Sequence, residues 1–117
     1  MNQEDLLNDE QILQQIKGDY WINTILFIFE QRSGEIVVTN KRILFYSKIF
    51  NKLSLDLALN LLDIEIVEKC GVGNLIPINP TGVKIKLKNG REFKLSSYHF
   101  NKLFETIDNL IDNKNKQ

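Results

Sequence analysis

Few side chains in this 117-residue chain have the chemistry of a catalytic or metal site. His99 is the only histidine, Cys70 is the only cysteine, and Ser96 and Ser97 are further candidate nucleophiles. A nucleophile needs a base within hydrogen-bond reach and a third group that orients the base, and nothing at short range supplies this set. One cysteine and one histidine are also too few for a structural zinc site. We therefore expect no catalytic site, no metal and no cofactor, with His99 solvated in the first turn of a helix.

Two further patterns resemble phosphate or nucleic-acid sites but are incomplete. Gly71-Val72-Gly73 has Ile76 where a third glycine would stand, and no lysine–serine pair follows, so we interpret these glycines as turn residues. Four lysines alternate along two neighbouring predicted strands: Lys84, Lys86, Lys88 and Lys94. A nucleic-acid surface would interleave exposed aromatic residues or arginines with this stripe, whereas here the aromatic residues face inward. We expect a solvated sheet face that guards against edge pairing, and no nucleic-acid partner.

The segment Lys48-Ile49-Phe50-Asn51-Lys52 has the composition of a membrane-surface contact. Its two lysines suit anionic headgroups, and the two apolar residues between them suit the boundary of the hydrocarbon layer. The alternative is structural, with Ile49 and Phe50 folding back to plug the open end of a β-sandwich. The sequence gives the two interpretations equal weight.

The composition limits the partners and the compartment. The formal net charge is zero, so the overall balance gives no reason to expect a polyanionic partner. Residues 1–35 carry seven acids and two bases, whereas residues 80–102 carry six bases and one acid. These halves either neutralise each other on folding, the commoner case, or orient the protein at a charged surface. A single cysteine fits a reducing compartment, and no apolar run approaches the ~20 residues of a membrane-spanning helix. We expect a cytoplasmic protein, with any membrane contact peripheral at the inner face.

The segment Gly34–Ser47 is the centre of the predicted fold. Apolar residues alternate with others before Asn40-Lys41, and β-branched and aromatic residues follow it, which predicts two half-buried strands joined by a two-residue turn. Such a turn makes one face of the hairpin apolar, because it pairs Val38 with Ile43 and Ile36 with Phe45.

This segment resembles the core motif of GRAM domains. The motif is carried by a glycine, an apolar pair, Thr39-Asn40, the basic Arg42, and alternating apolar and aromatic residues that end in Ser47. Asp63-Ile64 and Val67-Glu68-Lys69 also resemble a strand of that family. GRAM domains belong to the pleckstrin-homology-like (PH-like) superfold. The resemblance covers roughly residues 22–112, and it implies a non-enzymatic binding module.

PH-like domains that bind phosphoinositides use basic residues near the loops between strands 1 and 2 and between strands 3 and 4. The resemblance therefore implies that Arg32, Lys48 and Lys52 contact a ligand. Together with the two apolar residues of the Lys48–Lys52 segment, the predicted lipid- or partner-binding set has five residues: Arg32, Lys48, Ile49, Phe50 and Lys52. Gln31-Arg32-Ser33 carries one cation, unlike the basic signature of strong binders, so we expect any lipid association to be weak and sensitive to salt.

The first 34 residues are predicted as a helix, a strand and a turn. Residues 2–17 are expected to be helical, because Asn8 and Gln11 have capping-box spacing and Lys17-Gly18 is a suitable stop. The run Thr24–Glu30 is apolar on both faces, which predicts a strand covered on both sides, one of them by this helix. Gln31–Gly34 is the expected turn into the central hairpin.

Beyond the central hairpin, short strands are expected at Leu53–Leu57 and Ile64–Lys69, with a turn between them at Leu61–Asp63. The irregular piece 70–82 contains a possible edge strand at Leu75, Ile76 and Ile78. The last hairpin has two candidate loops. A two-residue Asn89-Gly90 turn would put apolar and charged residues on one face. A three-residue loop, 88–90 with Gly90 left-handed, is predicted instead because it keeps the faces apart and pairs Ile85 with Phe93 and Val83 with Leu95.

The chain ends in a predicted amphipathic helix that Ser96 or Ser97 can cap. Its apolar residues follow the helical i, i+3, i+4, i+7 pattern: Phe100, Leu103, Phe104, Ile107, Leu110 and Ile111. The predicted fold is α+β, mainly β: a PH-like, bent, seven-stranded antiparallel β-sandwich or open barrel, capped by this C-terminal helix and carrying an extra N-terminal helix. The expected division is a packing helix at 1–18, a PH-like domain at 19–112 and a disordered tail at 113–117.

Two functions follow from these expectations, and the sequence ranks them nearly equal. The first, slightly ahead, is protein–protein interaction or self-assembly through the N-terminal helix or an exposed sheet edge. The second is weak, salt-sensitive association with anionic membrane lipids through the Lys48–Lys52 loop. An enzyme is a distant third.

Overall fold

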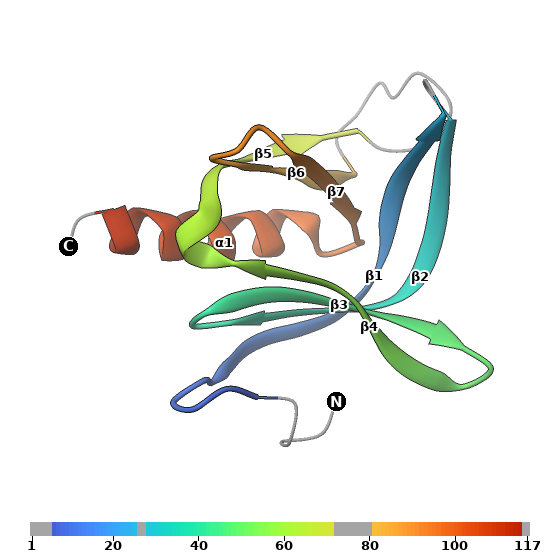
Figure 1. Ribbon diagram of the computed structural model, residues 1–117, viewed down its shortest axis with the longest axis horizontal. Helices are drawn as coiled ribbons and strands as arrows, with labels where there is room; N and C mark the ends of the chain where they lie inside the picture. The colour runs from blue at the N-terminus through green and yellow to red at the C-terminus, as the bar shows by residue number, and fades with distance from the viewer. Residues whose placement is uncertain (1–5, 26–27, 72–80, 116–117) are drawn as a thin grey trace.

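A computed structural model describes residues 6–25, 28–71 and 81–115 of the chain. The elements, in chain order, are β1 (Ile12–Ile25), β2 (Ile28–Thr39), β3 (Arg42–Ile49), β4 (Lys52–Asn60), the 3-10 turn η2 (Leu61–Asp63), β5 (Ile64–Cys70), β6 (Gly82–Leu87), β7 (Glu92–Ser96) and α1 (Phe100–Asn115). The strands form one antiparallel sheet in the order β4-β3-β2-β1-β7-β6-β5. Figure 1 shows this sheet folded over on itself, with β3 and β4 in one layer, β5–β7 in the other, and the long β1 and β2 running between them.

The core lies between the two layers and under α1. The helix packs against β5, β6 and η2 and closes one end of the sandwich (Figure 1). It buries Leu103, Ile107 and Ile111, the stripe that the helical spacing predicted. The helix extends to Asn115, three residues beyond Asp112, after which the sequence predicts a disordered tail. The mainly-β, seven-stranded fold with a C-terminal helix is confirmed.

Both predicted hairpin registers are confirmed. In the central hairpin, Val38 pairs with Ile43 and Ile36 with Phe45, and all four residues are fully buried. In the last hairpin, Ile85 pairs with Phe93 and Val83 with Leu95, and Gly90 has a left-handed φ of 91°. The three-residue loop therefore forms as the apolar faces require.

The predicted N-terminal helix is wrong, because these residues belong to β1. Pairs run from Ile12↔Thr39 to Ile25↔Ile28 along the whole length of β2. The pairing skips Leu13, which is a bulge between Ile12 and Gln14. This extra residue breaks the strand alternation and produces the four-residue apolar spacing that resembles a helix. Twelve residues of β2 need hydrogen-bond partners, and β1 supplies them.

The predicted strand at Thr24–Glu30 and turn at Gln31–Gly34 are also wrong. Thr24 and Ile25 end β1, and β2 already begins at Ile28. Gln31–Gly34 lies inside β2, where Gly34 pairs with Gly18 on one side and Ser47 on the other. The expected edge strand at residues 75–78 lies outside the described residues. The turn at Leu61–Asp63 is confirmed as η2.

A bulge in β4 separates its leucines. Phe45 pairs with Leu57 and Tyr46 with Leu55, so Asp56 is the extra residue. Because side chains alternate along each strand, Leu57 faces the core while Leu55 and Leu53 face the opposite, outer side of the sheet. Leu53 is 36% and Leu55 is 52% exposed.

The residues before β1 are tied to the β2–β3 turn. The carboxylate of Glu10 accepts hydrogen bonds from Arg42 Nη2 at 2.8 Å and Arg42 Nε at 2.9 Å, and from Thr39 Oγ1 at 2.7 Å. The side chain of Glu10 is fully buried. Asn40 Oδ1 accepts from the Gln11 amide at 2.7 Å. Three residues of the motif that resembles GRAM domains thus hold the start of the chain in place.

Candidate functional site

The most exposed apolar residues of the described chain include those at the end of the β3–β4 hairpin. Ile49 pairs with Lys52, which leaves Phe50 and Asn51 as a two-residue turn. Both have left-handed backbone angles, φ 51° and φ 65°, as tight hairpins of this kind require. A left-handed phenylalanine is strained. Phe50 is 96% exposed and Ile49 is 56% exposed.

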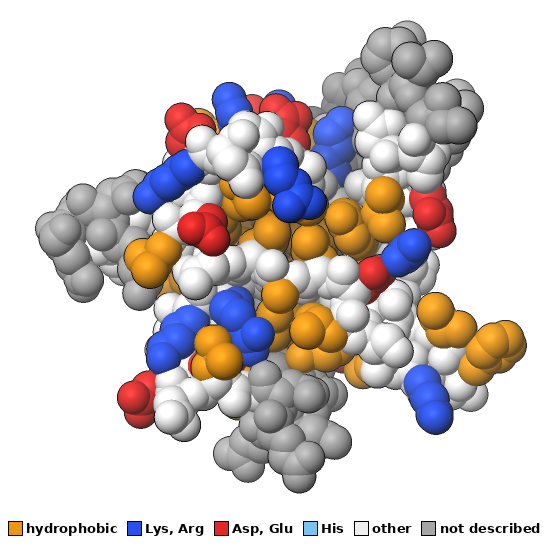
Figure 2. Space-filling view, in the orientation of Figure 1, with side chains coloured by type: hydrophobic (Ala, Val, Ile, Leu, Met, Phe, Trp, Pro, Cys, Tyr) orange, Lys and Arg blue, Asp and Glu red, His pale blue; other side chains and the backbone are white. Residues whose placement is uncertain are grey.

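These exposures exclude the interpretation that the two apolar residues plug the sandwich. Figure 1 shows the end of the β3–β4 hairpin projecting beyond the rest of the sheet, and Figure 2 shows hydrophobic side chains and a cation gathered there. Lys48 and Lys52 flank the turn and are exposed. No described carboxylate lies within ion-pair distance of either lysine. We call residues Lys48–Lys52 the hairpin tip.

Arg32, the fifth residue of the predicted site, is not in a loop but inside β2. Its Nη1 lies 2.7 and 2.8 Å from the two carboxylate oxygens of Asp56, and its Nε lies 3.4 Å from Glu30. The hydrogen bonds that Arg32 donates to the Asp56 carboxylate raise the pKa of the guanidinium. The structure therefore brings Lys48, Ile49, Phe50 and Lys52 together and places Arg32 in an ion pair of its own.

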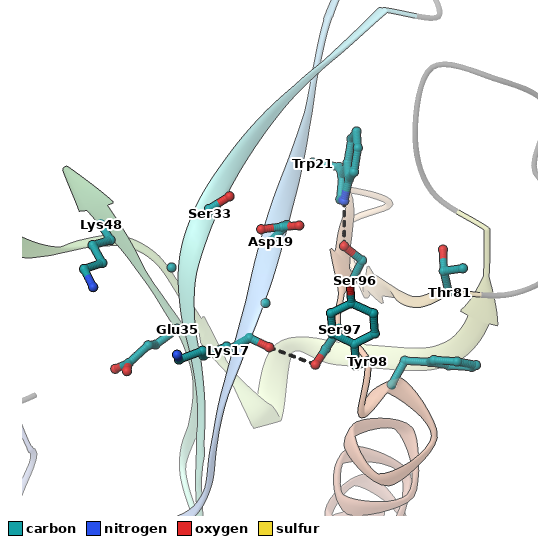
Figure 3. A pocket seen from close by; sticks show the side chains of 13 residues that line it. Lys17, Asp19, Trp21, Ser33, Glu35, Lys48, Thr81, Ser96, Ser97 and Tyr98 are labelled. Atoms are coloured by element: carbon teal, nitrogen blue, oxygen red, sulfur yellow. Dashed lines mark hydrogen bonds between the residues drawn. The ribbon is translucent and has the colours of Figure 1, made fainter. Parts of the chain in front are cut away.

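An open groove of about 720 Å³ lies beside the hairpin, between the outer face of β1–β3 and the start of α1 (Figure 3). Its lining combines cations, carboxylates, hydroxyls and aromatic rings: Lys17, Gly18, Asp19, Trp21, Ser33, Gly34, Glu35, Lys48, Thr81, Ser96, Ser97, Tyr98 and Phe100. Lys48 belongs to both the groove and the hairpin tip, so the two features form one continuous surface.

Hydrogen bonds fix the wall of the groove that comes from β7. Trp21 Nε1 donates to Ser96 Oγ at 2.8 Å, and Ser97 Oγ donates to the Lys17 carbonyl at 2.8 Å. Ser97 Oγ also accepts a hydrogen bond from the His99 amide at 3.1 Å. Ser97, rather than Ser96, is therefore hydrogen-bonded to the backbone that leads into α1. The two serines are thus structural hydrogen-bonding groups.

The groove's own charges are balanced. Asp19 accepts from the side-chain amide of Gln31 at 2.7 Å, and Glu35 accepts from that of Gln15 at 2.9 Å. Two carboxylates therefore face two lysines in one cavity. Sequence reasoning missed this groove because its members come from five separate segments. The only signal for the groove in the sequence was the outward position of charged residues along the segment that was predicted to be a helix.

The remaining candidates for chemistry stay apart. His99 is exposed, and burial raises the pKa of the Cys70 thiol, which lowers its reactivity. Among the described residues, no cluster of three or more His, Cys, Asp or Glu side chains could hold a metal ion. Lys84 lies 3.6 Å from Glu68, so a carboxylate interrupts the lysine stripe. No helix in the described ranges has the length and hydropathy to cross a bilayer.

A family model, "GRAM domain", matches residues 2–115 of the chain. The match includes the leading segment, which the sequence motif alone had left outside the family's span. No curated relative matches the chain.

Several solved structures with the same fold are PH domains or contain one, and all have low sequence identity to this chain. The Vps36 N-terminal PH domain is 17% identical with a TM-score of 0.68, over 96% of this chain and 86% of that one. The ligand-binding PH domain of Slm1 is 12% identical with a TM-score of 0.62, over 86% and 97%. A DH/PH fragment of PDZRHOGEF in complex with human RhoA is 12% identical with a TM-score of 0.66, over 89% and 29%. The chain thus spans about a third of the RhoGEF fragments that it matches, 32% and 29% of their lengths.

Proposed function

Because the chain belongs to the GRAM domain family, we propose that it is a binding module that associates weakly with anionic membrane surfaces through the hairpin tip. Under this proposal the protein is peripheral to the bilayer, with Phe50 and Ile49 in the interfacial region and Lys48 and Lys52 at the headgroups. Ligand binding by the PH domain of Slm1 is consistent with this proposal but concerns that protein.

The observation that carries the proposal is the exposure of Phe50. Exposing the Phe50 ring to water costs free energy. Its left-handed backbone conformation adds a strain energy. A membrane interface would remove the first cost, since the ring would leave water. The two lysines beside it supply the electrostatic attraction, about 1 kcal/mol for each cation near an anionic surface.

We expect the native protein to float with vesicles of phosphatidylserine and phosphatidylcholine, and not with phosphatidylcholine alone. Lys48→Glu combined with Lys52→Glu should weaken this binding at least tenfold, because attraction is replaced by repulsion. Phe50→Ser should weaken it about tenfold at every salt concentration, because it removes apolar area rather than charge.

The matched control is Lys88→Glu combined with Lys102→Glu. These two lysines are exposed and lie outside the hairpin tip, in the β6–β7 loop and on α1, and the net charge changes by the same amount. Equal loss of binding in the control pair would show that the change in net charge, and not the position of the lysines, explains the weaker binding. Full binding by the hairpin-tip variants would reject the proposal.

A second candidate is docking of a protein at a sheet edge. The N-terminal helix that favoured it is absent, since residues 12–25 form β1. Another observation favours it instead: β4 lies at the end of the sheet order, and its Leu53 and Leu55 are exposed. An extended segment can add to such an edge through backbone hydrogen bonds, with side chains giving specificity.

A further inference from the structure

The outward side of β4 is a strand edge that no other described strand covers. Within the described ranges, β4 pairs with β3 only, and its first half lies in the end of the hairpin that projects beyond the rest of the sheet (Figure 1). Sheet edges are usually protected by charges, bulges or covering segments. Here the bulge comes only at Asp56, so the stretch from Lys52 to Leu55 is regular. We call residues Lys52–Asp56 the β4 edge.

The β4 edge is complementary to itself. Its sequence is Lys-Leu-Ser-Leu-Asp, with a cation at one end, an anion at the other and two leucines placed evenly about Ser54. In an antiparallel pair, residues whose numbers have a constant sum lie opposite each other. A two-fold axis at Ser54 therefore places Lys52 opposite Asp56 and Leu53 opposite Leu55, twice over.

We propose that two copies of this chain pair antiparallel through their β4 edges, with the two-fold axis at Ser54. The proposal rests on the second candidate function and names its partner. The two-fold arrangement uses the same patch on both copies, as dimers of identical chains normally do.

The side chains of this pairing meet on both faces of the joined sheet. On the outer face, Leu53 and Leu55 of each copy cover those of the other, which removes four half-exposed leucines from water. On the inner face, Lys52 approaches the Asp56 of the second copy. That carboxylate already binds Arg32, which also binds Glu30. One guanidinium and two carboxylates leave one negative charge, so a further cation is complementary there.

The pairing also affects Phe50. Phe50 of one copy then lies just beyond the paired residues, past the bulge at Asp56 of the other copy. The two hairpin tips then point in opposite directions along the strands, so one bilayer cannot receive both. Self-pairing and membrane binding should therefore compete, and vesicles should dissociate the dimer. A ladder of five residues buries little area, so we expect a weak, concentration-dependent dimer.

The sharpest test is a disulfide across the two-fold axis. In a Cys70→Ser background, Ser54→Cys should cross-link in air to a dimer, because opposite Cα atoms in an antiparallel pair lie about 4.5–5.5 Å apart and disulfides span this range. The control is Ala58→Cys on the same strand, whose two copies would lie about 26 Å apart. Ala58→Cys should stay monomeric under the same conditions.

The second measurement is the dissociation constant of the dimer, obtained by sedimentation of protein that carries none of these cysteine changes. Leu55→Lys should raise the dissociation constant at least tenfold, because it puts two cations near the axis, one from each copy, in place of apolar contacts. Ile66→Lys is the matched control, since Ile66 is 43% exposed on β5 at the opposite edge of the sheet. Leu55→Lys should retain the native far-ultraviolet circular dichroism spectrum.

Three outcomes overturn the proposed pairing. These are equal cross-linking at positions 54 and 58, a native chain that sediments as a monomer up to millimolar concentration, and dimers that Leu55→Lys leaves unchanged. Amide exchange of residues 52–57, measured in buffer and in host lysate, then decides the second candidate. Protection that appears only in lysate would indicate a different protein on β4, and its absence would reject protein docking there as well.

Discussion

Replacing Glu10 with alanine is expected to lower the free energy of unfolding by about 3 kcal/mol. The side chain of Glu10 is fully buried and that of Arg42 is 17% exposed, so the guanidinium would lose its carboxylate in a place where water cannot fully replace it. Thr39 and the Leu7 amide would lose their acceptor as well. Urea denaturation followed by tryptophan fluorescence measures the effect, since the chain has one tryptophan.

Glu30→Ala is the control for this prediction. Glu30 also pairs with an arginine, but at 3.4 Å and with half of its side chain exposed, so its loss should cost less than about 1 kcal/mol. Glu10→Ala and Arg42→Ala together should cost less than the sum of the two single changes, because both remove the same interaction. Equal effects of Glu10→Ala and Glu30→Ala would show that the buried pair does not anchor the N-terminal segment.

The same contact predicts a loss of stability in acid. Hydrogen bonds from Arg42, and then from Thr39 and the Leu7 amide, lower the pKa of Glu10 from 4.5 to about 2, against the opposing effect of burial. A lowered pKa stabilises the folded chain in full above pH 4.5, and this stabilisation disappears as the pH falls toward 2. It amounts to about 3 kcal/mol. The urea midpoint of Glu10→Gln should therefore depend less on pH between 5 and 2.5 than that of the native chain, and parallel curves would contradict the assignment.

The two hairpins around Asn40-Lys41 and Gly90 were predictable because strand faces have a strict two-residue period. Only one loop length puts all the apolar residues of a hairpin on one side, so residue types alone select the register. The same logic failed in β1 and β4, where a bulge adds one residue. The bulge at Leu13 made a strand resemble a helix, and the bulge at Asp56 moved Leu57 to the opposite face from Leu55. The alternation of apolar and polar residues along one strand does not indicate at which residue the pairing with the neighbouring strand will skip.

The candidate site also has features that the sequence predicted and features that it did not. The hairpin tip is contiguous in sequence, so its composition was visible as a lysine-flanked apolar pair. Its outward orientation depends on the left-handed turn at Phe50 and Asn51, which the residue types do not suggest. Arg32 was predicted to lie in a turn at Gln31–Gly34 and to bind a ligand by analogy with a family, whereas long-range pairing places it inside β2 beside Asp56. The groove depends on contacts between β1 and β7, which are distant in sequence.

A family motif can be identified before its role is known, as in the case of Thr39, Asn40 and Arg42. They resemble the GRAM core motif in sequence, and the resemblance alone assigns them no role. In the structure, Arg42 binds Glu10, and Asn40 binds the backbone of Gln11. The motif therefore joins residues 7–11 to the central hairpin. On the next hairpin, Lys48 and Lys52 remain exposed.

Gly34→Ala is expected to prevent folding or to cost at least about 3 kcal/mol, beyond the usual range for one extra methyl group in a core. Gly34 pairs with Ser47 in the middle of the sheet. A Cβ atom there would lie 1.8 Å from the Tyr46 carbonyl oxygen and 3.0 Å from the Ser47 Cα atom. Both obstacles are backbone, so β3 would have to separate from β2 at the point where the central hairpin forms.

Gly90→Ala separates this crowding from the ordinary cost of replacing glycine. Gly90 has a left-handed φ of 91°, and an added Cβ meets nothing within 4 Å, so the substitution costs about 1–2 kcal/mol of backbone strain. Soluble yield and urea midpoints measured side by side should place Gly34→Ala far below Gly90→Ala. The opposite order would show that β2 and β3 lie further apart at Gly34 than this structure has them. The glycine of the GRAM-like motif would then have a role other than close strand contact.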